Sequence, residues 1–116
     1  MKFICLVYAE PEALSRLSAL EKAELDRDSL AYDNELEAAG HFLAASALQG
    51  VQTARSVRVR KGKPLIFDGP FAETKEVLCG FIFIEATDRD EALRIAQGIP
   101  MARHGTIEVR PELDIG

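Results

Sequence analysis

Two segments of the chain, residues 2–8 and 78–86, consist almost entirely of apolar residues, whereas the segments between them mix apolar and polar positions. Short continuous runs of this kind are typical of strands that are covered on both faces of a sheet. The first run is closed by Glu10 and Pro11, which do not favour a continuing strand. We therefore expect residues 2–8 and 78–86 to be the central strands of one sheet.

Apolar positions recur at helical spacing between residues 18 and 39, which predicts a long helix. Ser18 and Glu21 have the spacing of a capping box, in which each side chain bonds a backbone amide at the start of the helix. Gly40 provides the left-handed residue at which many helices end. Both ends of this helix are therefore marked in the sequence.

A second helix is predicted over residues 88–98. Asp88 and Glu91 repeat the capping arrangement, with an aspartate as the first residue. Gly98 and Pro100 mark the end of the helix. Its apolar residues make one buried stripe, formed by Ala92, Ile95, Ala96 and Ile99.

The segment 55–67 alternates apolar and polar residues, which predicts a β-hairpin that turns at residues 61–63. Its apolar and polar positions point to opposite sides: Val57 and Val59 to one, and Ser56, Arg58 and Arg60 to the other. We expect a hairpin with one face in water and the other buried.

Shorter strands are predicted at residues 41–48 and 106–110. With the hairpin set aside, the order is strand, helix, strand, strand, helix, strand, which is that of the ferredoxin-like fold. Right-handed crossovers place both helices on the same face of such a sheet. The expected fold class is therefore α+β, a ferredoxin-like βαββαβ unit with an inserted β-hairpin, as a single domain over residues 1–116.

The opposite face of this sheet has no cover within the predicted chain. Alternate residues of a strand point to opposite faces of the sheet. In residues 2–8, one face therefore receives Phe3, Cys5 and Val7 and the other receives Ile4, Leu6 and Tyr8. In residues 78–86, one face receives Cys79, Phe81 and Phe83 and the other receives Leu78, Ile82 and Ile84. Whichever sets face the helices, about six apolar side chains remain, each worth roughly 1.5 to 3 kcal/mol when buried. A second copy packed across a two-fold axis would cover them, so we expect a homodimer with a small-molecule cleft at the sheet edges.

The composition fits one globular domain, because 47% of the 116 residues are hydrophobic and 28% are charged. The net charge of −5 does not favour nucleic-acid binding, which normally requires a basic face, and we expect no nucleic-acid partner. Charge is segregated, with nine acids against three bases in residues 10–37 and a basic run at 55–63. These segments are either solvated surfaces or contact sites for an anionic ligand or an acidic partner surface.

Cys5 and Cys79 form no CxxC pattern and lie in apolar runs, so we expect two buried free thiols. The sequence lacks a phosphate loop and a dinucleotide fingerprint, and His41 and His104 stand alone, so we expect no cofactor and no metal site.

The N-terminal apolar stretch is too short for a signal peptide or a membrane span. We expect a soluble cytoplasmic protein that does not associate with membranes.

The stretch DGPFAETKE, residues 68–76, joins the hairpin to the second apolar strand. Asp68 and the glycine after it favour a tight turn, Pro70 restrains the backbone, and Phe71 would anchor the loop to the core. These properties describe a rigid connector. The alternative is a position at the mouth of a cleft, where Asp68 faces a ligand and Glu73 is either a solvated charge or an acid-base group.

The chain resembles the DGPF family of YCII-related proteins in several segments. These are DGPF with the AETKE that follows it, the preceding VRVRKGKPLIF, the helical LEAAG, the strand GFIFIEA and the closing HGTIEVRP. The resemblance covers nearly the whole chain and implies a dimeric α+β barrel of ferredoxin-like subunits. It identifies a family better than it identifies a function.

The resemblance implies two different kinds of role. A YCII-like domain occurs in a dehydrochlorinase acting on a chlorinated hydroxyhydroquinone, and a His-Asp pair with the histidine on the first helix has been proposed for YCII-like proteins. DGPF proteins are also encoded beside, or fused to, extracytoplasmic-function sigma factors. Residues 18–39 contain no histidine, and Tyr32, with an ordinary pKa near 10, is a poor base, so the pair is not transferred.

Two hypotheses follow. In the first, a homodimer binds a small molecule, with or without cofactor-free acid-base chemistry of the lyase or dehydrochlorinase type. The candidate catalytic residues are then Asp68 and His104, and the candidate ligand-binding residues are Tyr32, Arg58, Phe71 and Glu73. In the second, the protein is a non-catalytic regulatory or interaction module, for example with a sigma factor as its partner.

Overall fold

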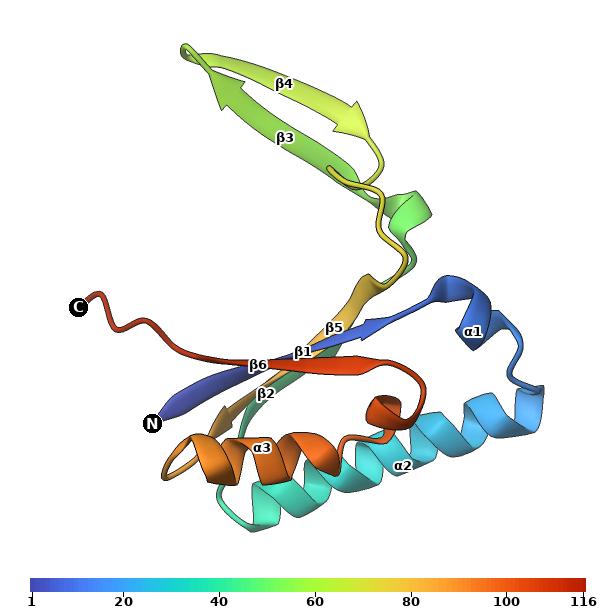
Figure 1. Ribbon diagram of the computed structural model, residues 1–116, viewed down its shortest axis with the longest axis vertical. Helices are drawn as coiled ribbons and strands as arrows, with labels where there is room; N and C mark the ends of the chain where they lie inside the picture. Colours follow the sequence, from blue (N-terminus) through green and yellow to red (C-terminus); the bar gives the residue numbers. More distant parts are fainter.

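Four strands form an antiparallel sheet in the computed structural model, which describes residues 1–116 (Figure 1). The strands are β1 (Lys2–Ala9), β2 (Phe42–Ala47), β5 (Val77–Glu85) and β6 (Thr106–Pro111). Their order across the sheet is β2-β5-β1-β6. The two apolar segments therefore occupy the central positions, as predicted.

Two helices, α2 (Ala19–Ala38) and α3 (Arg89–Gln97), cover one face of this sheet (Figure 1). The Glu21 amide donates to the Ser18 hydroxyl at 3.1 Å and the Ser18 amide donates to the Glu21 carboxylate at 3.0 Å, which confirms the predicted capping box. Gly40 follows the helix with a φ of +81°. The order β1-α2-β2-β5-α3-β6, with a hairpin inserted before β5, is the predicted ferredoxin-like α+β fold.

Three short helical segments were not predicted and lie in the connections. They are α1 (Pro11–Ser15), η1 (Val51–Thr53) and η2 (Pro100–Arg103). Both α1 and η2 begin with a proline, whose fixed φ and missing amide suit the first helical position. The first carries the chain from β1 to the start of α2. The second carries it from α3 to β6, and its Arg103 forms an ion pair of 3.3 Å with Asp28 in the middle of α2.

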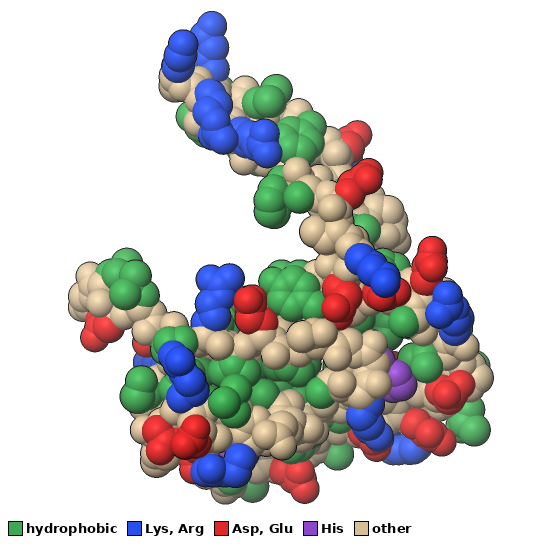
Figure 2. Space-filling view, viewed as in Figure 1, with side chains coloured by type: hydrophobic (Ala, Val, Ile, Leu, Met, Phe, Trp, Pro, Cys, Tyr) green, Lys and Arg blue, Asp and Glu red, His purple; other side chains and the backbone are tan.

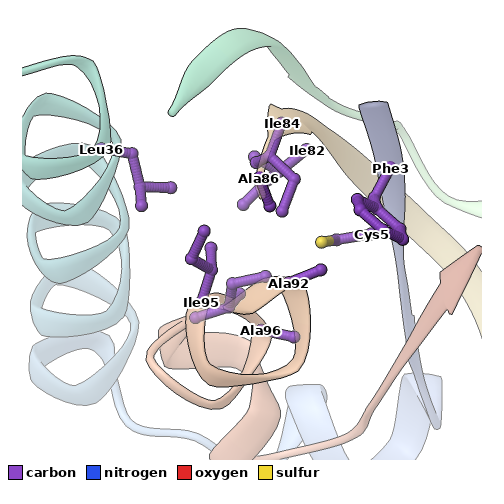
Figure 3. Packing of buried hydrophobic residues seen from close by; sticks show 10 residues of the cluster. Phe3, Cys5, Leu36, Ile82, Ile84, Ala86, Ala92, Ile95 and Ala96 are labelled. Carbon is purple, nitrogen blue, oxygen red and sulfur yellow. The ribbon is translucent and has the colours of Figure 1, made fainter. Parts of the chain in front are cut away.

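The hydrophobic core lies between the sheet and the two helices (Figure 3). The largest fully buried side chains are Phe3, Cys5 and Ile84, from the two central strands. The helices contribute Leu36 from α2 and the residues Ala92, Ile95 and Ala96 from α3. The core therefore shows which side of each central strand faces the helices, a choice that alternation alone leaves open.

A β-bulge interrupts the alternation in β5. The pairing with β1 shifts between Val7 and Tyr8, so that Leu78 pairs with Tyr8 and Cys79 is the extra residue. The prediction that Leu78 shares a face with Ile82 is therefore wrong. Leu78 lies beside Tyr8 on the opposite face and is exposed.

The face of the sheet away from the helices, called the open face below, has no helix over it (Figure 1). The central strands place half-buried apolar side chains on it: Ile4, Leu6 and Tyr8 from β1, and Phe81 and Phe83 from β5. On β6, Glu108 pairs with Leu6 and Arg110 with Ile4. The predicted apolar face without cover is thus present.

The strands β3 (Arg55–Arg60) and β4 (Lys63–Asp68) form a separate two-stranded hairpin, whose turn residues Lys61 and Gly62 both have positive φ. It stands away from the sheet on the side of the open face (Figure 1). The radius of gyration, 16.1 Å, accordingly exceeds the roughly 13 Å of a compact chain of this length. The prediction of a buried hairpin face is wrong, because Val57 and Val59 are 63% and 59% exposed.

Candidate functional site

A groove of about 770 Å³ lies between α2 and the helix-facing side of β2 and β5, and is called the α2 groove below. Hydrophobic residues make up 13 of its 20 lining residues, so its walls are mainly apolar. One wall is formed by α2, with Leu25 and Leu30, and the other by the strands, with Ala45 and Ile82. Leu17, which follows α1, and Met101 of η2 also line the groove. The composition and size are those of a small-molecule site.

Small residues in the strands leave this space open. Gly80 places no side chain in the groove, and the close backbone of β2 requires a glycine there, because a Cβ would lie 2.6 Å from the Ser46 carbonyl oxygen. On the neighbouring strand, Ala47 pairs with Gly80 and Ala45 pairs with Ile82, and these two small side chains fill little of the volume in front of the sheet. On the other wall, α2 buries only Leu36, close to its C-terminal end. The rest of α2 therefore lies over the sheet without filling the groove.

Asp33 is the half-buried carboxyl group of the α2 groove. Desolvation raises its pKa, with no opposing hydrogen-bond partner. Asp26 and Ser29 also line the groove, and their spacing of three and four residues places them on the same face of α2 as Asp33. A carboxyl group with a raised pKa beside apolar surface is suited to exchange a proton with a bound molecule.

Both cysteines are free, as predicted, although Cys79 is only half-buried. Cys79 lines the α2 groove, and its Sγ lies 3.3 Å from the Val77 carbonyl oxygen. Desolvation raises the pKa of Cys79, and it raises that of Cys5 to about 11. Both side chains are therefore neutral thiols at pH 7, and Cys79 offers the groove polarizable apolar surface rather than a nucleophile.

Tyr32 lies on α2 but does not line the groove. Its hydroxyl donates a hydrogen bond of 2.6 Å to the Ile95 carbonyl oxygen of α3, and Gly98 leaves space for its ring. Burial is the main cause of a further rise in the pKa of this phenol. The hydroxyl is thus already paired within the fold, and the predicted role of Tyr32 in ligand binding stays a prediction.

Asp68 lies at the base of the hairpin. Its Oδ1 accepts a hydrogen bond of 2.8 Å from Arg55 on the facing strand, and both side chains are exposed. The Gly69 amide, at a φ of +91°, donates to the Ala54 carbonyl oxygen at 2.8 Å. DGPF therefore works as a connector that holds the hairpin base. Phe71 does not anchor it to the core as predicted, because the loop runs out with the hairpin and leaves Phe71 75% exposed.

The remaining predicted site residues lie apart from one another. Arg58 stacks over Phe67 on the hairpin at 5.6 Å from the ring centroid, Glu73 is exposed in the loop before β5, and His104 is exposed just after η2. None of the six predicted site residues lines the α2 groove. Asp68 is the last residue of β4 in the hairpin, whereas His104 follows η2 before β6, and their predicted catalytic roles stay predictions.

Sequence reasoning missed the groove although two signals were present. One is the run AASA at residues 44–47, which puts small side chains on a strand next to Gly80. The other is the polar set Asp26, Ser29 and Asp33 on a helix face that also carries Leu25 and Leu30. Together they indicate a helix face that is not fully packed against its sheet.

No group of three or more His, Cys, Asp or Glu side chains is placed to hold a metal ion. None of the helices is long and apolar enough to cross a membrane.

The sequence matches the YCII-related domain over residues 1–115. It is 34% identical over 113 residues to an uncharacterized protein of Rhizobium meliloti (strain 1021), covering 96% of this chain and 91% of that protein. The structure is similar to that of the 5-chloro-2-hydroxyhydroquinone dehydrochlorinase TftG of Burkholderia phenoliruptrix AC1100 in complex with 2,5-dihydroxybenzoquinone. The TM-score is 0.58 at 16% identity, over 97% of this chain and 94% of the other, and at this identity the likeness concerns the fold.

Proposed function

This chain belongs to the YCII-related family, and we propose that it binds a small molecule in the α2 groove and transfers a proton to or from it. The observation that carries the proposal is the half-buried Asp33 carboxyl group, with its raised pKa, on the wall of a mainly apolar groove. A ligand with one flat apolar part and one or two polar groups suits such a groove. The apolar part lies on the strand floor, and a polar group lies toward α2.

The reaction class that fits this arrangement is a cofactor-free elimination. The Asp33 carboxylate takes a proton from a substrate carbon, the electrons of the broken C–H bond form a double bond, and the leaving group departs with its bonding pair. Desolvation makes the carboxylate a stronger base than an exposed aspartate. The structural neighbour is named as a dehydrochlorinase, an enzyme of this reaction class, which supports the proposal.

The proposed assembly is a homodimer in which two open faces pack against each other. Each copy would bury the five half-buried side chains of the open face, and complete burial of such a side chain is worth roughly 1.5 to 3 kcal/mol. The α2 groove lies on the other side of the sheet and stays accessible in this dimer. The predicted cleft at the sheet edges is thus not needed for ligand binding.

A thermal-shift screen tests the binding site, with 2,5-dihydroxybenzoquinone and related phenols as probes. A bound ligand should raise the melting temperature of the wild-type protein by mass action. Ala45→Phe fills the groove from the strand side and should abolish the shift, whereas Glu37→Gln, on the exposed end of α2, should keep it. An equal shift in wild type and Ala45→Phe would place binding elsewhere.

Chloride release from 5-chloro-2-hydroxyhydroquinone tests the chemistry. Asp33→Asn should retain the thermal shift and lose at least about 100-fold in turnover, the usual contribution of a general base. Glu37→Gln is the matched control and should turn over normally. Unchanged turnover in Asp33→Asn would remove Asp33 from the mechanism. If the wild-type protein binds the probe without releasing chloride, the proposed elimination is wrong and only the binding function remains. The regulatory role beside a sigma factor stays a prediction.

A further inference from the structure

The hairpin of residues 55–68, called the arm below, has no apolar support from the rest of its own chain. One of its faces carries Val57, Val59 and Ile66, which are 63%, 59% and 64% exposed. Its one hydrogen bond to another segment is donated by the Ser56 hydroxyl to the Gly69 carbonyl oxygen, at its base. A two-stranded hairpin without a packed face is at best marginally stable in water. The arm therefore has the properties of an element that is completed by contact with another molecule.

The position of the arm restricts what that molecule is. The arm rises on the side of the open face, so that arm and sheet border one hollow space (Figures 1 and 2). A molecule seated on the open face therefore also lies next to the arm. In the proposed dimer that molecule is the second copy.

The charge of the arm also points to a second copy. The arm holds five of the 14 Lys and Arg residues and one of the 19 acids, which leaves nine bases and 18 acids in the rest of the chain. The arm thus carries a charge of +4 and the rest of the chain −9. Lys and Arg side chains gather at the free end of the arm (Figure 2), and Arg60, Lys61 and Lys63 form no salt bridge within the chain. The body of another copy is an acidic surface that would pair with them.

The length of the arm matches the distance that it would have to span. Six residues per strand extend about 20 Å at roughly 3.3 Å per residue. Two sheets stacked face to face lie about 10 Å apart, and a helix layer adds about another 10 Å. The free end of the arm would therefore reach the helix layer of the second copy. That layer contains the acid-rich segment 10–37.

We propose that the arm clasps a second copy of this chain, with Val57, Val59 and Ile66 against the side of its sheet and the basic end against its acidic segment 10–37. The proposal rests on the homodimer proposed above and adds a second contact to it. In this proposal the basic end of the arm and its apolar face share one role, which is to hold the two copies in a fixed arrangement.

The apolar contact is tested with the double variant Val57→Ser and Ile66→Ser, measured by sedimentation equilibrium. The dissociation constant of the dimer should rise at least about tenfold, because two side chains leave the interface of each copy. The matched control is Leu113→Ser with Ile115→Ser, which removes two side chains that are 81% and 88% exposed at the C-terminus. This control should dimerise like the wild type. Circular dichroism checks that the body of each variant stays folded.

The charge contact is tested with the double variant Arg60→Glu and Lys63→Glu. Dimerisation should weaken, and added salt should weaken it less than in the wild type, because attraction between opposite charges has been replaced by repulsion between like charges, which salt screens. Arg89→Glu with Arg94→Glu, on the exposed side of α3, changes the net charge by the same amount away from the arm and is the control. Only the arm variant should show the altered salt dependence.

The outcomes separate the arm from the remainder of the proposal. Wild-type dimerisation in both arm variants would overturn the clasp and leave the dimer of open faces intact. A wild-type protein that stays monomeric at all concentrations would overturn both, and the arm would then be free to bind an acidic protein of another kind. Ligand binding in the α2 groove is unaffected in either case, since no arm residue lines it.

Discussion

The hydroxyl of Tyr32 donates a hydrogen bond of 2.6 Å to the carbonyl oxygen of Ile95, which joins the middle of α2 to the last turn of α3. Helix-terminal carbonyls lack partners within their own helix, so this bond satisfies an acceptor that also receives the Gly98 amide at 3.1 Å. It is the one side-chain hydrogen bond between the two long helices.

Tyr32→Phe should lower the free energy of unfolding by about 1 kcal/mol. The phenylalanine ring keeps the packing of the tyrosine ring, and the Ile95 carbonyl oxygen loses one of its two donors. The loss in the free energy of unfolding is therefore that of a single hydrogen bond. Urea unfolding of wild type and variant measures the difference. The control Tyr8→Phe alters a phenol on the open face, for which the structure shows no hydrogen bond, and should change stability far less.

Gly98→Ala should destabilise the protein by roughly 1 to 3 kcal/mol, the usual cost of overpacking. The φ of Gly98 is −84°, which any residue adopts, so the cause is space: a Cβ there would overlap the Tyr32 ring and hydroxyl. A double-mutant cycle separates this contact from helix propensity. In a Tyr32→Ala background the same substitution should cost little, and an undiminished cost would point to another cause.

Asp33→Asn should stabilise the protein at pH 7. The folded-state pKa of Asp33 is raised by desolvation, so the native state binds more protons than the unfolded state between the two pKa values, and stability falls as pH rises through that window. The asparagine side chain does not titrate, so Asp33→Asn avoids this loss of stability at high pH. The advantage of Asp33→Asn should therefore be present at pH 7 and shrink toward pH 4, as followed by urea midpoints in both buffers. Glu37→Gln, for the same charge change on exposed surface, should lack this pH dependence.

The two thiols should differ in their reaction with an aromatic disulfide reagent at pH 8. Cys5 is fully buried with a pKa of about 11, and should react only through global unfolding. Cys79 is half-buried beside the α2 groove, and should react faster. Single variants Cys5→Ala and Cys79→Ala assign each kinetic phase. A groove ligand should slow the reaction of Cys79 by covering it, and should slow that of Cys5 only as far as it lowers the unfolded population.

Local signals in the sequence were sufficient for most of the fold. Ser18 and Glu21 are three residues apart, so the capping box depends on nothing distant, and the same holds for the turn at Lys61 and Gly62. The apolar runs of β1 and β5 identified the central strands, because apolar residues at both alternating positions are typical of the inner strands of a sheet.

Features that depend on distant contacts were not predictable in this way. The bulge at Cys79 arises from the pairing of β5 with β1, and simple alternation placed Leu78 on the wrong face. The direction of the arm follows from loops whose path no local pattern defines, and it exposes Val57 and Phe71. Asp33 was overlooked because helical spacing shows which residues share a face, but not how far that face lies from the sheet.

The two outermost strands of the sheet differ in a way that bears on aggregation. β6 carries Glu108, Arg110 and Pro111, residues that discourage a foreign strand from adding at a free edge. β2, with the sequence FLAASA, has neither charge nor proline at the other edge. When chains of this protein associate through backbone pairing, the β2 border is where they should join, because a strand that arrives there meets free backbone groups and no repelling charge.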